Sequence, residues 1–139
     1  MTQLDEAHFH LHSKNKAKMS NMNKFYDNKN KTMLVDGDLL VYKITSSLEE
    51  PIDWGNDIWT LSSDLKKGKQ LFTQAIAYYW DLTKSKDTVI CFSDKENFRK
   101  QIDSEYKSYR KKIRKPISYA PLRQWIEETH TTITYPNLE

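Results

Sequence analysis

The segment TVICFSD, Thr88–Asp94, decides the fold class of this chain. It is an apolar, largely β-branched run of strand length that stops at a carboxylate. A strand without polar alternation is typical of a parallel sheet that helices cover on both faces. Cys91, the one cysteine of the chain, lies in this run and is expected to be a buried small apolar side chain. A single cysteine cannot form an internal disulfide, which suits a reducing compartment.

Further strands and helices are expected on either side of this segment. TMLVDGD (residues 32–38) is a second strand candidate, and LLVYKI continues it as a short helix. Apolar residues at three- and four-residue steps predict a long helix from about Asp64 to Lys84, capped by Ser62 or Ser63. Between them, PIDWGNDIWT (residues 51–60) is expected to be a loop with Gly55 and Asn56 as turn formers.

The last part of the chain adds one helix and one strand. Ser118 is a plausible cap for a helix through Thr129, with Pro121 in its first turn and with Leu122, Trp125 and Ile126 facing inward. TTITY, residues 131–135, is the third strand candidate. Alternating strands and helices predict an α/β domain of three layers around a mainly parallel sheet.

The first 31 residues differ from the rest in composition. They are rich in Lys, Asn, Ser and Met without an apolar period, so a disordered polar leader is expected over residues 1–31 and the folded domain over 32–139. His8, His10 and His12 alternate within the leader. Because no Cys or acidic residue lies at ligand spacing from them, a metal site is not expected there. No secretory signal and no stretch of 18 apolar residues occurs, which excludes a transmembrane helix and leaves the cytoplasm of a cell as the expected location.

Three carboxylates follow the three predicted strands. Asp36 ends the first, Asp94 ends the second, and Glu139 comes shortly after the third. Because side chains at the carboxyl ends of parallel strands meet at one edge of the sheet, these residues are expected to converge. Oxygen ligands of this kind suit Mg²⁺ or Mn²⁺. The alternative is that an aspartate at a strand end serves only as a turn or cap residue.

A strongly basic segment follows Asp94. Eight Lys and Arg residues and two acidic residues lie between Arg99 and Lys115, so this segment carries +6 while the whole chain carries +3. A local basic stripe on a nearly balanced protein indicates a polyanionic partner, although a charge run taken alone is often only a solvated face. An acidic metal site beside a basic stripe is the combination that phosphodiester hydrolysis requires.

The chain resembles the bacteriophage 5′-to-3′ exonucleases of the flap-endonuclease superfamily, which have a PIN-like fold. The pieces that carry the resemblance run from residue 33 to residue 139: MLVDGDLLVYK, IDWGNDIWTLSSD, ICFSDKENFRK, YKSYRKKIRKP and YPNLE. The most specific is FSD-x-x-x-NFRK followed by YK-x-x-R. The resemblance therefore implies a metal-dependent DNA exonuclease or flap nuclease, with two Mg²⁺ or Mn²⁺ ions in the complete site.

The resemblance also implies individual roles. Asp36 and Asp94 would be metal ligands, with Glu139 as the third ligand expected from its place after the last strand. Lys107 and Arg110 would grip the scissile phosphate, and Tyr106 would stack on a base near the strand end. Arg99, Lys111 and Lys115 are candidates for contacts with the DNA backbone. Asp38 matches the family only loosely and is expected to cap the following helix. Trp54 and Trp59 are candidates for base stacking, with packing beneath their loop as the favoured interpretation.

The family pattern continues beyond the position of Glu139 with further carboxylates and a duplex-binding region. The chain therefore corresponds to the amino-terminal half of such a nuclease, truncated relative to it, and is expected to show little activity without a complementing carboxyl-terminal half. Two other functions are compatible with the sequence. One is a nucleic-acid-binding remnant without catalysis, and the other is a small PIN-type ribonuclease, which the tyrosine and lysine pattern disfavours.

Overall fold

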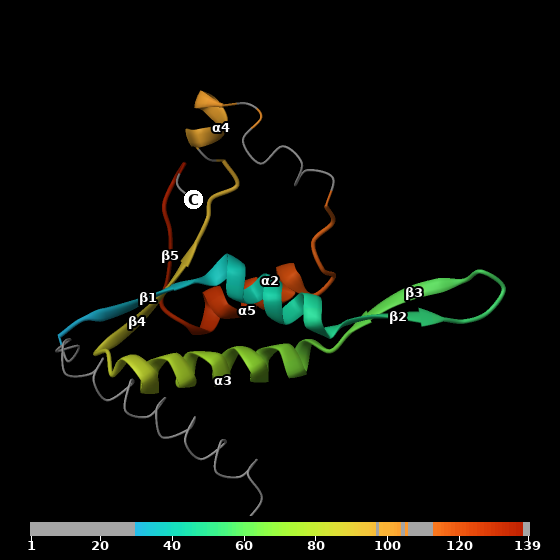
Figure 1. The fold of residues 1–139 in the computed structure, drawn as a ribbon, viewed down its shortest axis with the longest axis horizontal. Coiled ribbons are helices and arrows are strands. Elements are labelled where there is room, and N and C mark those ends of the chain that lie inside the picture. Colours follow the sequence, from blue (N-terminus) through green and yellow to red (C-terminus); the bar gives the residue numbers. More distant parts are fainter. Residues whose placement is uncertain (1–29, 97, 104, 106–112, 138–139) are drawn as a thin grey trace, which may run out of the picture.

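The structure is a computed structural model that describes residues 30–96, 98–103, 105 and 113–137. The predicted leader therefore lies outside the described residues, except for its last two positions. A three-stranded sheet and a two-stranded sheet are present, and three long helices accompany them (Figure 1). Within these residues, no helix combines the length and the apolar character needed to cross a membrane.

The main sheet is parallel, as the sequence predicted. Its order is β1 (Thr32–Asp36), β4 (Asp87–Phe92) and β5 (Thr132–Thr134). β4 lies in the centre and pairs in parallel with both neighbours, with Asp36 beside Cys91 and Cys91 beside Ile133. All three strands therefore end at the same edge of the sheet.

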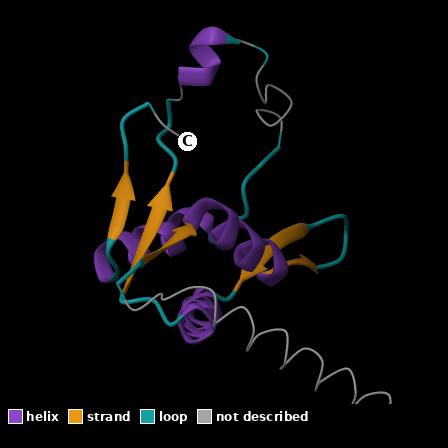
Figure 2. Cartoon of the chain, turned by 60° about the vertical axis from the view of Figure 1, so that its left-hand side comes forward, coloured by secondary structure: helices purple, strands orange, loops and turns teal. Residues whose placement is uncertain are grey.

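Helices α2 (Gly37–Leu48), α3 (Leu65–Thr83) and α5 (Tyr119–Thr129) build the core together with one face of this sheet (Figure 2). Phe72 of α3 and Leu122 of α5 are fully buried, and Trp125 meets the Phe72 ring edge to face, with centroids 6.3 Å apart. Gly37 begins α2 where a Cβ would lie 2.6 Å from the Phe92 ring, so only glycine lets α2 approach β4 this closely.

The boundaries of α3 and α5 agree with the sequence prediction, whereas α2 is longer than the expected segment LLVYKI. Two of the predicted helix caps differ from those in the structure. Asp64, rather than Ser62 or Ser63, caps α3 by accepting a hydrogen bond of 2.9 Å from the amide of Lys67. Ser118 occupies the N-cap position of α5 without a capping bond, because its hydroxyl lies 2.8 Å from the Ser63 hydroxyl. Both serines instead connect the start of α5 to the end of the second sheet.

The expected loop over residues 51–60 is wrong. The segment forms an antiparallel hairpin of β2 (Glu49–Asp53) and β3 (Trp59–Ser63), which extends away from the body of the molecule (Figure 1). The predicted turn formers are correct, since Gly55 has φ 81° and Asn56 has φ 51°, both left-handed. The strands were missed because their side chains are largely exposed and so do not follow a buried apolar pattern.

The prediction that helices cover both faces of β4 is also not met by the described residues. Ile90 and Phe92 are buried under the helices, whereas Val89 and Cys91 point to the opposite face and are only partly buried. The α/β class and the parallel sheet are confirmed. The described part of the chain supplies helices to one face only.

Candidate active site

The carboxyl ends of β1 and β4 bring together the residues of the DGD and FSD segments. Asp36 is the last residue of β1 and the N-cap of α2, where its Oδ1 accepts a hydrogen bond of 2.9 Å from the amide of Leu39. The capping role expected for Asp38 therefore belongs to Asp36. The side chain of Asp36 is fixed at the strand end by this bond and remains exposed.

Asp38 connects three elements instead of capping its own helix. Its Oδ2 accepts a hydrogen bond of 2.6 Å from the Ser93 amide just after β4, and its Oδ1 accepts one of 2.6 Å from the Tyr119 hydroxyl at the start of α5. Arg123, one turn further along α5, lies 3.4 Å from the same Oδ1. Asp38 thus holds the start of α2, the end of β4 and the start of α5 in one arrangement.

The network around Asp38 keeps this carboxylate ionised. Burial raises the pKa of Asp38, but the hydrogen bonds from Tyr119 and Ser93 and the charge of Arg123 outweigh burial, so that the net shift is downward. The pKa of Tyr119 is raised, first by burial and then by its hydrogen bond to Asp38. Tyr119 therefore remains a hydrogen-bond donor over the whole physiological pH range.

Asp94 follows β4 by two residues and is fastened by backbone donors from both sides. Its Oδ1 accepts from the amide of Lys95 at 2.7 Å, and its Oδ2 accepts from the amide of Asn137 at 3.0 Å. The hydrogen bond from Asn137 contributes most to lowering the pKa of the Asp94 carboxyl, and the bond from Lys95 lowers it further. Asp94 is therefore a fixed anion at the strand ends.

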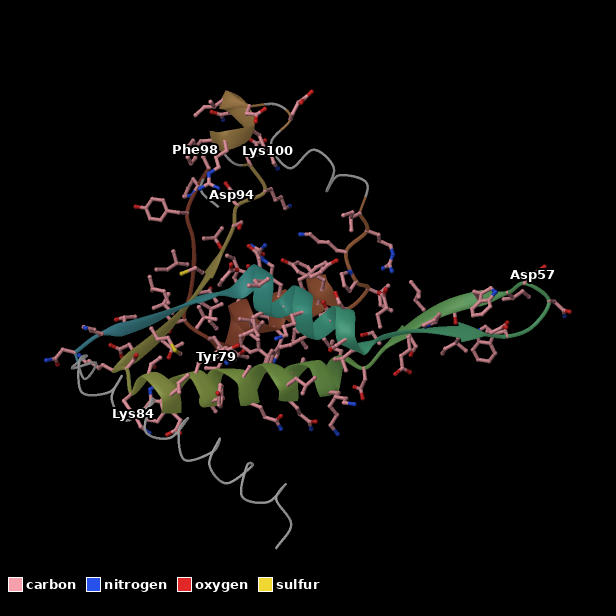
Figure 3. All side chains as sticks on the ribbon, in the orientation of Figure 1. Asp57, Tyr79, Lys84, Asp94, Phe98 and Lys100 are labelled. Atoms are coloured by element: carbon pink, nitrogen blue, oxygen red, sulfur yellow. The ribbon has the colours of Figure 1, made fainter. Side chains whose placement is uncertain are left out.

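The segment after β5 closes on the same place. Asn137 donates to Asp94, and its carbonyl oxygen accepts a hydrogen bond of 3.0 Å from the amide of Phe98, the first residue of α4 (Phe98–Ile102). Figure 3 shows Asp94 near Phe98 and Lys100 at this end of the molecule, far from Asp57 at the tip of the hairpin. Asn137, which precedes Glu139 by two residues in the sequence, is thus in contact with Asp94.

Part of the basic segment can be placed relative to these carboxylates. Arg99 lies on α4, with its guanidinium 6.0 Å from the centre of the Phe98 ring. Lys115 lies over the ring of Tyr119, 4.3 Å from its centre, and so beside the partner of Asp38. The described ends of the basic segment are therefore both attached to the region of the strand ends.

The return of the basic segment is anchored by Glu49, where α2 passes into the hairpin. Glu49 accepts hydrogen bonds from the guanidinium of Arg114 and, at 2.7 Å, from the amide of Ile117. The bond from Arg114 is the main cause of a lowered pKa at Glu49. One carboxylate thus connects the basic segment to the hairpin.

Five of the predicted site residues lie outside the described residues, so their predicted roles stay predictions: Tyr106, Lys107, Arg110, Lys111 and Glu139. Among the residues that are described, no group of three His, Cys, Asp or Glu side chains is arranged to hold a metal ion. The predicted three-carboxylate site includes Glu139 and is therefore not tested.

The described donors are chemically suitable for a hard divalent cation. Asp36 and Asp94 supply carboxylate oxygens from neighbouring strand ends, and a carboxylate oxygen that accepts one hydrogen bond keeps a second lone pair. Asp38 is less suitable, because Tyr119 and Arg123 already occupy and neutralise it. Asp36 and Asp94, the two aspartates that the sequence selected, are thus better suited than Asp38 to bind a cation.

The hairpin places two large aromatic side chains in solvent. Trp54 is 65% exposed and Trp59 is 60% exposed, so the favoured interpretation that they pack beneath a loop is wrong. The indole of Trp54 donates a hydrogen bond of 2.8 Å to the hydroxyl of Thr60 within the hairpin. Cross-strand pairing puts Trp59 opposite Asp53 and Thr60 opposite Ile52, so the two indoles lie on opposite faces of the ribbon.

Sequence reasoning missed the residues that organise the site. Tyr119 and Arg123 lie 81 and 85 positions after Asp38, and neither belongs to a local motif. One signal was available: α5 carries Tyr119 and Arg123 four residues apart, on one face of a helix that must pack against the sheet. Arg123 also lies 4.5 Å from the centre of the Phe92 ring, which orients it toward β4.

Two curated proteins are similar to this chain over the same length. One is the exonuclease of Escherichia phage T7 and the other is the exodeoxyribonuclease of Enterobacteria phage T3. Each is 33% identical over 91 residues, which are 63% of this chain and 30% of the relative. The chain thus matches less than a third of the length of these relatives. No family model matches the chain, and no solved structure matches it.

Proposed function

We propose that this chain is the amino-terminal part of a metal-dependent 5′-to-3′ DNA exonuclease that acts on 5′ ends or flaps in the cytoplasm of a bacterial host. The observation that carries the proposal is the fixed position of Asp36 and Asp94 at neighbouring ends of parallel strands, with the basic segment attached beside them. The similarity to two phage exonucleases points to the same chemistry.

In this proposal the carboxylates Asp36, Asp94 and Glu139 hold Mg²⁺ or Mn²⁺, with two ions in the complete site. The ions would supply Lewis-acid activation of water and of the leaving oxygen. The backbone amides of Lys95 and Asn137 keep the Asp94 carboxylate ionised and in one orientation. Asp94 therefore needs no rearrangement to act as a ligand.

The basic segment binds the substrate. Lys107 and Arg110 grip the scissile phosphate and Tyr106 stacks on the terminal base, while Arg99, Lys111 and Lys115 contact the backbone of the DNA. Lys115 rests on the ring of Tyr119, which is hydrogen-bonded to Asp38, so a phosphate bound by Lys115 would lie beside the carboxylate network. Trp54 and Trp59, exposed on the hairpin, are additional positions for stacking on bases.

A nuclease assay with 5′-labelled duplex and flap DNA in Mg²⁺ or Mn²⁺ tests the catalytic part of this proposal. We expect little or no cleavage by the chain alone, because the proposed ligands Asp36, Asp94 and Glu139 are only three carboxylates for two ions. Robust cleavage that Asp94→Ala abolishes would show that the chain needs no complementing half. Robust cleavage that survives Asp94→Ala would contradict the proposed site.

DNA binding tests the other part. We expect binding to weaken steeply with salt, and we expect Lys107→Ala or Arg110→Ala to reduce the log–log salt slope by about 1 each, as for the loss of one phosphate contact. Lys66→Ala on the exposed side of α3 removes the same charge away from the site and serves as the matched control. Equal effects of all three changes would mean that the protein binds DNA through its overall charge alone.

A further inference from the structure

Glu49, the first residue of β2, binds the chain that leads from the basic segment into α5 at two points. Its Oε2 accepts a hydrogen bond of 3.1 Å from Nη1 of Arg114 and one of 2.7 Å from the amide of Ile117. Its Oε1 accepts a further bond from Nη2 of Arg114, so that the guanidinium and the carboxylate meet through two parallel bonds. The Glu49 side chain is only 14% exposed. This geometry fixes the pair better than an ordinary ion pair at a surface.

The cross-strand partner of Glu49 binds the same part of the chain. Ser63 of β3 pairs with Glu49 in the hairpin, and its hydroxyl lies 2.8 Å from the hydroxyl of Ser118. Figure 1 shows this part of the chain, drawn in orange before α5, beside the place where the hairpin begins. Both strands at the base of the hairpin therefore hold residues 114–118.

Lys115 lies between the two residues that Glu49 holds. Its carbonyl oxygen accepts a hydrogen bond of 2.9 Å from Nη1 of Arg114, the same nitrogen that binds Glu49. On its other side Pro116 is buried, and the carbonyl oxygen of Pro116 accepts a bond of 3.0 Å from the amide of Tyr119. The backbone of Lys115 is thus fixed on both sides, and its ammonium lies 4.3 Å from the centre of the Tyr119 ring.

The ammonium of Lys115 is available to an anion. The residue is exposed, and no carboxylate in the described part of the chain forms an ion pair with it. A lysine side chain has many rotamers, and binding a phosphate restricts them at a cost in entropy. A fixed backbone and the support of the Tyr119 ring reduce this cost before the phosphate arrives.

We propose that Glu49 is a positioning residue for DNA binding, which holds residues 114–117 so that Lys115 presents its ammonium to a phosphate of the DNA backbone. The inference rests on the proposed function, which supplies the DNA. Glu49 acts through Lys115, since Arg114 and Ile117 already occupy its carboxylate. Removal of Glu49 also removes a negative charge, which by itself favours binding of a polyanion. Such a charge effect leaves the contribution of Lys115 unchanged, whereas positioning makes that contribution depend on Glu49.

The salt dependence of DNA binding measures the contribution of Lys115 with and without Glu49. A 5′-phosphorylated duplex is bound by the full chain in EDTA at several salt concentrations and followed by fluorescence anisotropy. Lys115→Ala alone should reduce the log–log salt slope by about 1, as for the loss of one phosphate contact. In the Glu49→Ala background, Lys115→Ala should reduce the slope by less than about half as much. Glu50→Ala removes the neighbouring exposed carboxylate of β2 and is the matched control, in which the full reduction should return.

Nuclear magnetic resonance tests the positioning without DNA. The Tyr119 ring should shift the ε-methylene protons of Lys115 upfield, because the ammonium lies over the ring. We expect Glu49→Ala to return these resonances to the position of a free lysine, and Glu50→Ala to leave them shifted. Glu49→Gln keeps an oxygen that can accept from the amide of Ile117 but loses the charge that binds Arg114, so part of the shift should remain. Circular dichroism verifies that each variant is folded, and Glu49→Gln replaces Glu49→Ala in both experiments if the alanine variant is not.

Three results would overturn the proposal. Unchanged Lys115 resonances in Glu49→Ala would show, whatever the protein binds, that Glu49 does not position Lys115. Equal slope reductions by Lys115→Ala with and without Glu49 would make Glu49 only a charge near the DNA. Failure of the wild-type chain to bind DNA would refute the proposed function and the phosphate contact of Lys115 together. The resonances of Lys115 would in that case still show whether Glu49 holds it, so the two failures are distinguishable.

Discussion

Asp36, Asp38 and Asp94, which we call the strand-end cluster, and the β2–β3 hairpin both display side chains that the sequence analysis singled out. The two regions hold these side chains in different ways. At the strand ends, Asp38 receives hydrogen bonds from Ser93 and Tyr119, which come from other elements. On the hairpin, Trp54 bonds through its indole to Thr60 and through its amide to the carbonyl of Ile58, both within the same ribbon. Changes in the first region should therefore alter the whole fold, whereas changes in the second should alter only what the hairpin binds.

The largest expected effect comes from Asp38→Ala. It leaves the Ser93 amide and the Tyr119 hydroxyl without their acceptor and removes a partner of Arg123, which should cost about 3 kcal/mol of the free energy of unfolding. Urea unfolding followed by circular dichroism measures this loss. Glu50→Ala on exposed β2 is the matched control and should change stability by less than about 0.5 kcal/mol. Equal losses in both variants would remove the distinction between the two regions.

The two glycines of these regions sharpen the comparison. At Gly37, an added Cβ would meet Ile90 at 2.7 Å as well as Phe92, so Gly37→Ala should cost about 2 kcal/mol through overpacking. At Gly55 an added Cβ has open space, and only the left-handed φ of 81° opposes alanine, at about 1 kcal/mol. Thermal unfolding of both variants gives the order, and a larger loss at Gly55 would contradict the close approach of α2 to β4.

Acid should weaken the strand-end cluster specifically. Because the folded pKa of Asp38 is below its ordinary value of 3.8, its contribution to stability is complete above that value and is lost as pH falls through the folded pKa. Wild type should therefore lose more stability than Asp38→Asn as the pH falls below the ordinary aspartate pKa of 3.8. Parallel pH dependences of the two proteins would show that Asp38 is not held ionised by its partners.

The smallest effect on stability is expected from the hairpin. Trp59→Ala removes a side chain that is 60% exposed and should change the free energy of unfolding by less than about 0.5 kcal/mol. The same variant should bind single-stranded DNA less tightly by about 1–3 kcal/mol, the range for loss of one stacked base. Unchanged DNA affinity, measured by fluorescence anisotropy, would remove Trp59 from the proposed binding surface.

The sequence predicted the elements whose side chains follow a simple period. The apolar run of β4 and the helical spacing of α3 reflect the regular burial of side chains along a strand and a helix. Both elements were predicted correctly. The hairpin was not, because its strands bury almost nothing and only its turn residues carry a signal. Local chemistry thus identified the turn but could not distinguish a loop from a ribbon.

The placement of Asp36 and Asp94 at strand ends was predictable, but the hydrogen bonds that hold the neighbouring aspartates were not. Asp36 and Asp94 follow from the rule that parallel strands end at one edge. The exchange of roles between Asp36 and Asp38 does not, because it depends on Tyr119 and Ser93, which only the fold brings to Asp38. A capping aspartate and a bridging aspartate two residues apart have the same local sequence signal.

The central claim is that the strand-end carboxylates and the basic segment form one site for a metal ion and DNA. The most direct test measures binding of a 5′-phosphorylated duplex by anisotropy, in Ca²⁺ or in EDTA, for wild type and Asp94→Asn. Asp81→Asn, an exposed carboxylate on α3, is the control. We predict that Ca²⁺ strengthens binding by wild type and by Asp81→Asn but not by Asp94→Asn. Binding that is equally insensitive to Ca²⁺ in all three proteins would contradict the claim and indicate a nucleic-acid-binding protein without a metal site.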